Sequence, residues 1–207
     1  MTEERTERKI ANHILTGVVL ALIIGGLLLL VPSKYYLNRH DDGAATSSTV
    51  LEVEGSLLEK AEPTLLSIPK INLETSFTKP LGLDGEGAVE VPDDYEQVGW
   101  YENSPTPGEL GPAVILGHVD SREGPAVFFS LGQLSEGDDI FITRADGSTA
   151  HFQVVTLERY EQVAFPTAKV YGDINYAGLR LITCTGTYEK GKQRYTQNLV
   201  VYAKLVE

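Results

Sequence analysis

Near its C-terminus the chain reads Leu179-Arg180-Leu181-Ile182-Thr183-Cys184, an apolar run that ends in the only cysteine of its 207 residues. A short continuous run of this kind is typical of a strand buried on both faces of a sheet. The single cysteine has no intramolecular disulfide partner. It is therefore either a small buried hydrophobe or a free thiol with a chemical role. The sequence around it decides between these two interpretations.

The surrounding chain alternates short apolar segments with Gly, Pro, Asp and Asn, the pattern of an all-β fold. Residues 63–207 have the usual size of one domain. The pair Asp146-Gly147 between two such segments predicts a β-hairpin. Many short strands hide their edges best in a closed or nearly closed β-barrel. The expected strands are Thr64–Ile68, Ala88–Val91, Ala113–His118, Asp139–Thr143, Ala150–Leu157, Leu179–Thr183 and Asn198–Leu205.

An uncharged run of 18 residues, Ile14–Val31, lies near the N-terminus. A helix of this length spans about 27 Å, close to the hydrocarbon thickness of a bilayer. A cleaved signal peptide would have a shorter apolar core and a site of small residues behind it, whereas Pro32-Ser33-Lys34-Tyr35-Tyr36 follows here. The run therefore predicts an uncleaved transmembrane helix over residues 14–31, after a short cytoplasmic N-terminus of residues 1–13.

Charge indicates on which side of the membrane the remainder lies. Three basic residues precede the apolar run and two follow it closely, a small positive-inside bias. Residues 1–39 hold five of the 17 basic and three of the 29 acidic residues, which leaves 12 basic and 26 acidic residues and a net charge of −14. So acidic a domain is unsuited to nucleic acid, because phosphate contacts need cations. We expect a single-pass protein of the cell membrane, with an extracellular spacer (residues 32–62) and an extracellular domain (residues 63–207).

A working cysteine needs a partner that lowers the pKa of its thiol or takes its proton. Of the four histidines, His13 and His40 lie outside the expected domain, and His151 lies in a hairpin where a solvated side chain is the simpler interpretation. His118 instead ends an apolar run and begins a polar loop. A lone histidine at a strand end is often structural. Because His118 and Cys184 each lie at a strand end, we interpret them as a catalytic pair.

Around these two residues the sequence resembles the sortase family, and within it the class F group. The histidine region is Gly111-Pro112-Ala113-Val114-Ile115-Leu116-Gly117-His118-Val119-Asp120-Ser121, followed by Gly124-Pro125-Ala126-Val127-Phe128-Phe129. The cysteine region, Leu179–Gly186, holds the family pattern Leu-x-Thr-Cys. Further similar stretches are Val89–Pro92, Val98–Tyr101, Phe165–Thr167, Val170–Gly172 and Asn198–Ala203. The two motifs occur in the family's order, 66 residues apart, and the resemblance covers residues 63–207.

This resemblance implies a membrane-tethered cysteine transpeptidase with an eight-stranded β-barrel and short helices. The thiolate would attack the Thr–Gly carbonyl of an LPxTG-like sorting signal, form an acyl-enzyme thioester, and pass the protein to the amine of a cell-wall precursor. By match to the motifs, Cys184 is the expected nucleophile and His118 the general acid that protonates the departing amine. The implied partners are LPxTG-like surface proteins, the cell-wall amine and the membrane.

The family's third residue is an arginine on the strand after the cysteine, where its cationic fork steadies the oxyanion or the substrate. Counting back from the Val-Val-Tyr-Ala strand, this position holds Asn198. The nearest arginine is Arg194, which is the catalytic candidate. Arg180 is an alternative, because it lies four residues before Cys184 and strand alternation puts both side chains on one face. For each arginine a surface position is the competing interpretation.

Three more residues are candidates for supporting roles. Asn198 can itself supply an amide donor. Asp120 can orient His118, or it can be an Asx-turn residue in a polar loop. Arg122, on the same loop, is a weaker alternative to the other arginines.

We expect no metal and no cofactor. The acidic residues lack the spacing of a calcium loop, and one cysteine with scattered histidines cannot supply a closed zinc site. The acidic residues considered are Asp138, Asp139, Glu158, Glu161 and Asp173.

Other classes of protein fit less well. Cysteine L,D-transpeptidases carry Ser-His-Gly-Cys, papain-like proteases carry Cys-Gly-Ser-Cys-Trp, and the chain has neither motif. The non-enzymatic alternative is a membrane-anchored β-domain that binds or scaffolds surface proteins, with Cys184 simply buried.

Overall fold

The computed structural model describes residues 56–206. The expected transmembrane helix, residues 14–31, and most of the expected spacer lie outside the described residues. Within residues 56–206, no helix is long and apolar enough to cross a membrane.

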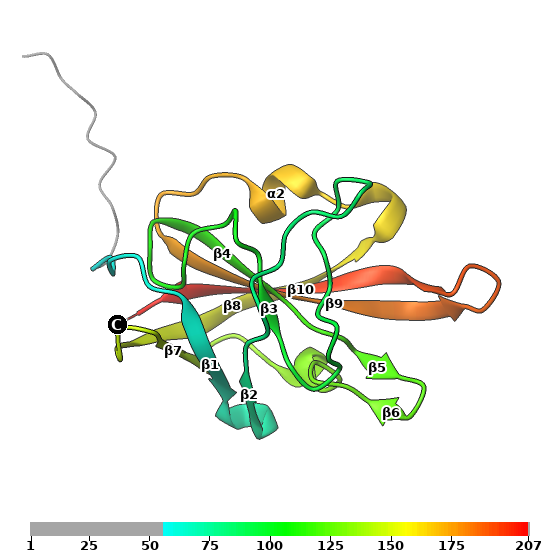
Figure 1. The fold of residues 1–207 in the computed structure, drawn as a ribbon, viewed down its shortest axis with the longest axis horizontal. Coiled ribbons are helices and arrows are strands. Elements are labelled where there is room, and N and C mark those ends of the chain that lie inside the picture. The colour runs from blue at the N-terminus through cyan, green and yellow to red at the C-terminus, as the bar shows by residue number, and fades with distance from the viewer. Residues whose placement is uncertain (1–55, 207) are drawn as a thin grey trace, which may run out of the picture. The chain divides into compact units, whose positions relative to one another are not determined.

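Eight strands form one sheet in the order β2-β1-β7-β8-β10-β9-β4-β3 (Figure 1). A separate pair, β5 and β6, forms a small ribbon beside it, and the helical elements are short. The sheet strands are β1 (Pro63–Ile68), β2 (Leu73–Ser76), β3 (Gly99–Trp100), β4 (Gly111–Leu116), β7 (Asp139–Arg144), β8 (Thr149–Glu161), β9 (Ala177–Glu189) and β10 (Arg194–Leu205). The remaining elements are β5 (Asp120–Ser121), β6 (Gly124–Pro125), the 3₁₀ turns η2 (Pro69–Ile71), η3 (Leu131–Gln133) and η4 (Gln162–Ala164), and α2 (Thr167–Tyr171).

The sheet curls strongly, but it does not close into a continuous barrel and forms a half-barrel. Its edge strands β2 and β3 are joined by no continuous ladder, only by isolated parallel bridges such as Phe77–Val98. The segment between these strands, the β2–β3 loop (residues 77–98), contains Pro80 and Pro92, which have no N–H to donate to a ladder. The prediction of an all-β, eight-stranded fold is confirmed, and in place of the expected closed or nearly closed barrel the structure shows a curled half-barrel.

The expected strand Ala88–Val91 is wrong. It belongs to the β2–β3 loop and makes only an isolated bridge, between Val89 and Leu83. Asp84 explains the local structure, because its Oδ1 accepts hydrogen bonds of 2.9 Å from the backbone N–H groups of Glu86 and Ala88. An Asx turn of this kind competes with strand pairing for the backbone donors.

The other six expected strands are present as β1, β4, β7, β8, β9 and β10. The Asp146-Gly147 hairpin is confirmed: Gly147 has a φ of +82° and donates from its N–H to the Arg144 carbonyl at 3.0 Å. Strand β4 ends at Leu116, two residues before His118. Strands β2, β3, β5 and β6 were not predicted, because segments of two to four residues are too short to show a periodicity.

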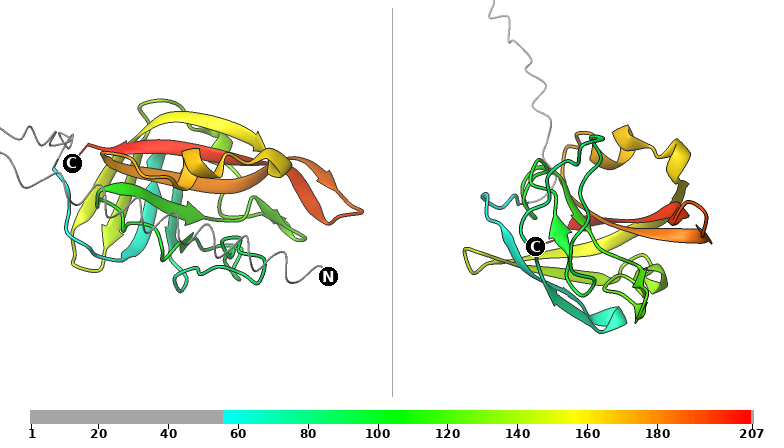
Figure 2. Two further views of the ribbon diagram at one scale, coloured as in Figure 1. Left: turned by 90° about the horizontal axis from the view of Figure 1, so that it is seen from above. Right: turned by 45° about the vertical axis from the view of Figure 1, so that its right-hand side comes forward.

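The central strand β9 is buried on both faces from Ala177 to Thr183. It pairs antiparallel with β10 and parallel with β4. Leu179 and Leu181 pack into the main core inside the curl. On the opposite face, Ile182 packs in a smaller cluster with Val170 of α2. Figure 2 shows the β8–β9 connection (residues 162–176), which includes α2, arching over the strands on this second face.

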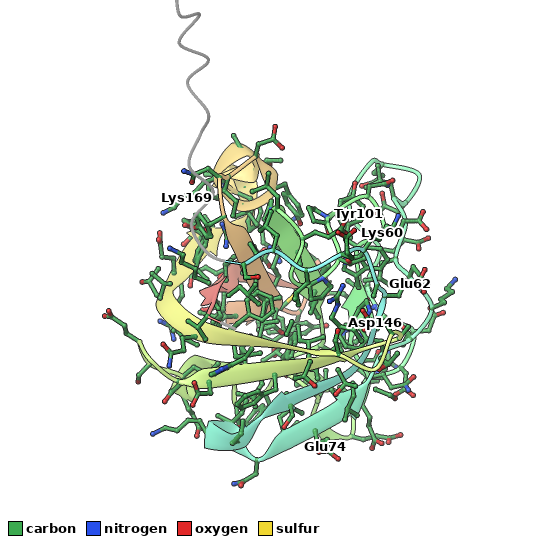
Figure 3. The ribbon with its side chains drawn as sticks, turned by 90° about the vertical axis from the view of Figure 1, so that its left-hand side faces the viewer. Lys60, Glu62, Glu74, Tyr101, Asp146 and Lys169 are labelled. Carbon is green, nitrogen blue, oxygen red and sulfur yellow. The ribbon has the colours of Figure 1, made fainter. Side chains whose placement is uncertain are left out.

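Helix α2 packs on this second face of the sheet. Figure 3 shows Lys169 on α2 at one end of the curled sheet and Glu74 on β2 at the other. Lys169 closes an ion pair with Glu158 of β8, with Nζ 2.6 Å from Oε2, which fastens α2 to the sheet. Burial of Val170 in the smaller cluster holds the helix in the same place.

Candidate active site

A cavity of about 530 Å³ opens on the second face of the sheet and is lined by both His118 and Cys184. Residues of β4 and β9 line it, together with Asn198 of β10. The β2–β3 loop contributes apolar side chains, including Val89 and Val91. The β8–β9 connection contributes further lining residues, among them Phe165 and Tyr171. Two residues 66 positions apart thus meet in one largely apolar cavity.

Cys184 lies where β9 emerges from the core. The strand is buried up to Thr183, and Cys184 is the first residue that is only half-buried. Burial raises the pKa of the Cys184 thiol, and the negative charge of Asp120 adds to this effect. The resting side chain is therefore a thiol. A thiolate has to be generated by proton transfer to a partner.

His118 is held by the β2–β3 loop. Its Nε2 lies 2.8 Å from the carbonyl oxygen of Pro92. A carbonyl only accepts, so Nε2 carries the proton and Nδ1 is the free nitrogen of the neutral ring. Tyr95 packs against the ring, with centroids 4.4 Å apart. Gly117, the residue before His118, packs closely against Phe128, because a Cβ there would lie 2.7 Å from a ring carbon of Phe128.

Asp120 has a different partner from the expected one. The hydroxyl of Tyr195 donates a hydrogen bond to Asp120 Oδ2. This bond is the largest of the causes that raise the pKa of Tyr195 to about 12. The carboxylate of Asp120 is therefore bonded to β10. The hydrogen-bond partner of His118 is the backbone carbonyl of Pro92. The hydrogen bond of Asp120 with Tyr195 joins the segment after His118 to β10, the strand that pairs with the strand of Cys184.

The structure brings none of the candidate arginines into the cavity lining. Arg194 lies at the start of β10, about half-exposed, with its Nε 3.9 Å from Glu189 Oε2. Arg180 shares the sheet face of Cys184, as strand alternation predicts, but it is buried with its guanidinium 4.6 Å from the ring centre of Tyr202. Arg122 lies in the turn between β5 and β6.

Asn198 lies directly opposite Cys184 in the β9–β10 ladder and lines the cavity. Its Oδ1 accepts a hydrogen bond of 3.0 Å from Nε2 of Gln162. The same Nε2 lies 4.0 Å from Cys184 Sγ, the outer limit of an N–H···S contact. Sequence reasoning missed Gln162, which lies in η4, 36 residues before Asn198 and outside both motifs. No pattern in the sequence marks it.

The residues that the structure describes include no group of three or more His, Cys, Asp or Glu side chains that could hold a metal ion. The polar groups of the cavity are side-chain amides, hydroxyls, one imidazole and one thiol. This set suits nucleophilic and acid–base chemistry on a carbonyl group.

An all-β sheet curled into a half-barrel, with a thiol and an imidazole in one cavity, is the arrangement of the sortase fold. The family model described as the sortase domain matches residues 66–206, and the chain therefore belongs to the sortase family. Members of this family are generally cysteine transpeptidases.

Solved structures of sortases share the fold. A lid mutant of sortase A from Corynebacterium diphtheriae is 24% identical with a TM-score of 0.53, covering 72% of this chain and 73% of that one. Sortase C1 from Streptococcus suis is 18% identical with a TM-score of 0.53, covering 71% and 74%. A Clostridium perfringens sortase D5 transpeptidase is 20% identical with a TM-score of 0.51, covering 73% and 83%. No curated protein matches the chain.

Proposed function

We propose that this protein is a class F-like sortase that cleaves an LPxTG-like sorting signal between Thr and Gly and transfers the cleaved protein to a cell-wall amine. One observation carries the proposal: Cys184 and His118 line the same cavity in a chain of a cysteine transpeptidase family. Cys184 is the nucleophile and His118 the general acid and base.

The reaction begins with proton transfer from the Cys184 thiol to Nδ1 of His118, which is the free ring nitrogen because Nε2 is bonded to Pro92. The thiolate attacks the Thr carbonyl carbon and forms a C–S bond. The oxyanion then collapses, the C–N bond to Gly breaks, and His118 returns its proton to the departing amine. A thioester remains on Cys184.

The second half of the reaction reverses these steps with a new amine. The acceptor amine attacks the thioester carbon and loses a proton to His118. The C–S bond breaks, an amide forms, and the thiolate is regenerated. Because each half is a separate acyl transfer, one imidazole serves in turn as base towards the thiol, as acid towards the departing amine and as base towards the acceptor amine.

The cavity lining supports a substrate with an apolar head. Leu83 and Val91 of the β2–β3 loop and Phe165 of the β8–β9 connection line the cavity. Leu83 and Val91 are each half-exposed or more, at 50% and 58%. Exposed apolar side chains beside a cavity favour an apolar ligand, which the Leu-Pro portion of a sorting signal provides.

The proposal includes a location. We place the domain outside the cell, tethered by residues 14–31, because the apolar run has the length of a bilayer and the remaining chain is strongly acidic. A tether keeps an acidic domain close to a surface whose anionic lipids would repel it. Surface proteins with sorting signals and cell-wall precursor amines are the partners that this location supplies.

The test is an acyl-transfer assay on the full-length chain in detergent. Fluorogenic peptides that vary each position of LPxTG are incubated with an amine acceptor, using wild type, Cys184→Ala and His118→Ala. We expect turnover by wild type only, and an acyl adduct on Cys184 that mass spectrometry detects and hydroxylamine releases. If wild type and Cys184→Ala behave alike across the library, the enzyme hypothesis fails and the anchored scaffold replaces it.

A further inference from the structure

The cavity around Cys184 has an unusual charge balance for a site that must hold an oxyanion. None of its lining residues is a lysine or an arginine. The nearby cations are engaged elsewhere: Arg180 lies against the Tyr202 ring, Arg194 beside Glu189, and Lys169 on Glu158. No lysine or arginine of the lining can stabilise the developing charge, and the protonated His118 is committed to the departing amine, so the remaining side-chain donors are neutral.

Asn198 is in the correct place to be such a donor. It is the direct cross-strand neighbour of Cys184 in an antiparallel ladder. Side chains in such pairs lie on the same face with Cβ atoms about 5 Å apart. Both residues line the cavity. A substrate carbonyl carbon bonded to Cys184 Sγ therefore has its oxygen within reach of the Asn198 side chain.

Gln162 fixes which way the Asn198 amide faces. Its Nε2 donates to Asn198 Oδ1 at 3.0 Å, so the oxygen of that amide is occupied and points towards Gln162. The amide nitrogen, Nδ2, points the other way. It makes no hydrogen bond to any residue in the part of the chain that the structure describes. The same Nε2, which has a second N–H to donate, lies 4.0 Å from Cys184 Sγ, at the outer limit of an N–H···S contact.

We infer that the Gln162–Asn198 amide pair takes the place of a cation at this site. Asn198 Nδ2 is the catalytic donor that holds the oxyanion of the tetrahedral intermediate, and Gln162 is a positioning residue that orients Asn198 and donates to the sulfur. The inference rests on the proposed function and adds to it. Amide side chains serve as oxyanion donors in other acyl-transfer sites, where loss of one donor costs about 10²–10³-fold in kcat.

The pair also differs from a cation in its effect on the thiol. An amide donor stabilises a thiolate through one N–H, without a net charge, so Cys184 relies on His118 for its deprotonation. This gives Gln162 an effect that can be measured without any substrate. Loss of its N–H should make the thiolate harder to form.

The experiment uses the full-length chain with six variants: Asn198→Ala, Asn198→Asp, Gln162→Ala, Gln162→Glu, the double alanine variant and Arg194→Ala. Asn198→Asp keeps the size and the acceptor, removes the donor and adds a negative charge. Gln162→Glu removes the donor beside the sulfur and adds a negative charge. Gln133→Glu, at an exposed residue of the 3₁₀ turn η3, is the control for added charge. Thermal melting checks that every variant is folded.

Two measurements are made on each variant: kcat and KM for acyl transfer, and the rate of alkylation by iodoacetamide against pH. We expect both Asn198 variants to lose about 100-fold in kcat with little change in KM, because the lost bond forms only in the transition state. Gln162→Ala should lose about tenfold, and the double variant should be no slower than Asn198→Ala, since the two residues act as a unit. Both Gln162 variants should move the alkylation profile to higher pH. The shift should be larger for Gln162→Glu, because it also adds a negative charge.

The outcomes separate this inference from the proposed function. If wild type forms a Cys184 adduct but the Asn198 and Gln162 variants stay within threefold of it, the pair is not catalytic and the inference is overturned. The inference is also overturned if Arg194→Ala loses 100-fold while Asn198→Ala does not. If wild type forms no adduct, the proposed function has failed. The alkylation profiles then still test whether Gln162 donates to the sulfur. Profiles of the Gln162 variants that are identical to wild type would show that it does not.

Discussion

Tyr195 of β10 donates a hydrogen bond from its hydroxyl to the carboxylate of Asp120, two residues beyond His118. The bond spans 75 residues of sequence and joins the loop that follows His118 to the strand opposite Cys184. It is the one side-chain hydrogen bond between these two segments among residues 56–206. It adds a side-chain tie to the parallel β4–β9 ladder and the Gly117 N–H bond to the Ile182 carbonyl, which hold the histidine and cysteine segments side by side.

Removal of this bond should weaken both stability and turnover. In Tyr195→Phe the phenyl ring keeps its contact with Tyr188, and only the hydroxyl is lost. We expect the free energy of unfolding to fall by about 1 kcal/mol, a decrease of about 3 °C in Tm, and kcat/KM to fall several-fold. Thermal melting and the acyl-transfer assay measure the two effects. An unchanged kcat/KM with a lowered Tm would show that the bond serves stability alone.

Asp120→Asn should make the thiol more acidic. The charge of Asp120 is the second cause, after burial, of the raised pKa of Cys184. Without that charge the pKa falls, so a larger fraction is thiolate at any pH below it, and alkylation at pH 7 becomes faster. Because burial persists, the pKa stays above its ordinary value. The iodoacetamide rate against pH checks this, with the exposed Glu136→Gln as the matched loss of one charge. A profile that moves to higher pH would contradict it.

The sequence was sufficient for the long strands and for the expectation that Cys184 and His118 lie near each other at two strand ends. Periodicity and continuous apolar runs identify β9 and β10, because these strands are long and buried. The degree of closure of the sheet could not be predicted from the sequence, since it depends on the path of residues 77–98 between the two edge strands. The support of His118 by Pro92 is equally invisible, because every residue carries a backbone carbonyl.

The amide pair shows where such reasoning succeeds and where it ends. Asn198 was found by counting along a strand, where register relates position to geometry. Gln162 belongs to a short turn whose place over the sheet is set by the packing of residues such as Phe165 and Val170. Tertiary packing of this kind leaves no local signal. Candidate site residues on strands are therefore easier to predict than those on the connections that cover them.

Gly117→Ala should destabilise the site next to His118. A Cβ at this position would lie 2.7 Å from a ring carbon of the fully buried Phe128, and real structures do not show such a distance. The chain or the ring must shift, and overpacking of this kind costs about 2 kcal/mol. We expect a decrease of about 6 °C in Tm and a lower kcat/KM, because His118 is the next residue.

A matched glycine provides the control for this variant. Gly85 lies in the β2–β3 loop with nothing within 4 Å of a Cβ, and it needs no positive φ. Gly85→Ala should therefore melt within about 1 °C of wild type. If the two alanine variants have equal Tm values, the close approach of Gly117 to Phe128 does not constrain the fold.

The lone cysteine also allows the proposed location to be tested. Cys184 is the only thiol in the chain, so a membrane-impermeant maleimide applied to intact cells can label it only if the domain lies outside. Since burial raises the pKa of this thiol, labelling should be slow at pH 7 and about tenfold faster at pH 8, in proportion to the thiolate fraction. Cys184→Ala gives the background, and lysed cells give the full signal. Labelling that appears only after lysis would place the domain inside and would remove its access to surface proteins and wall precursors.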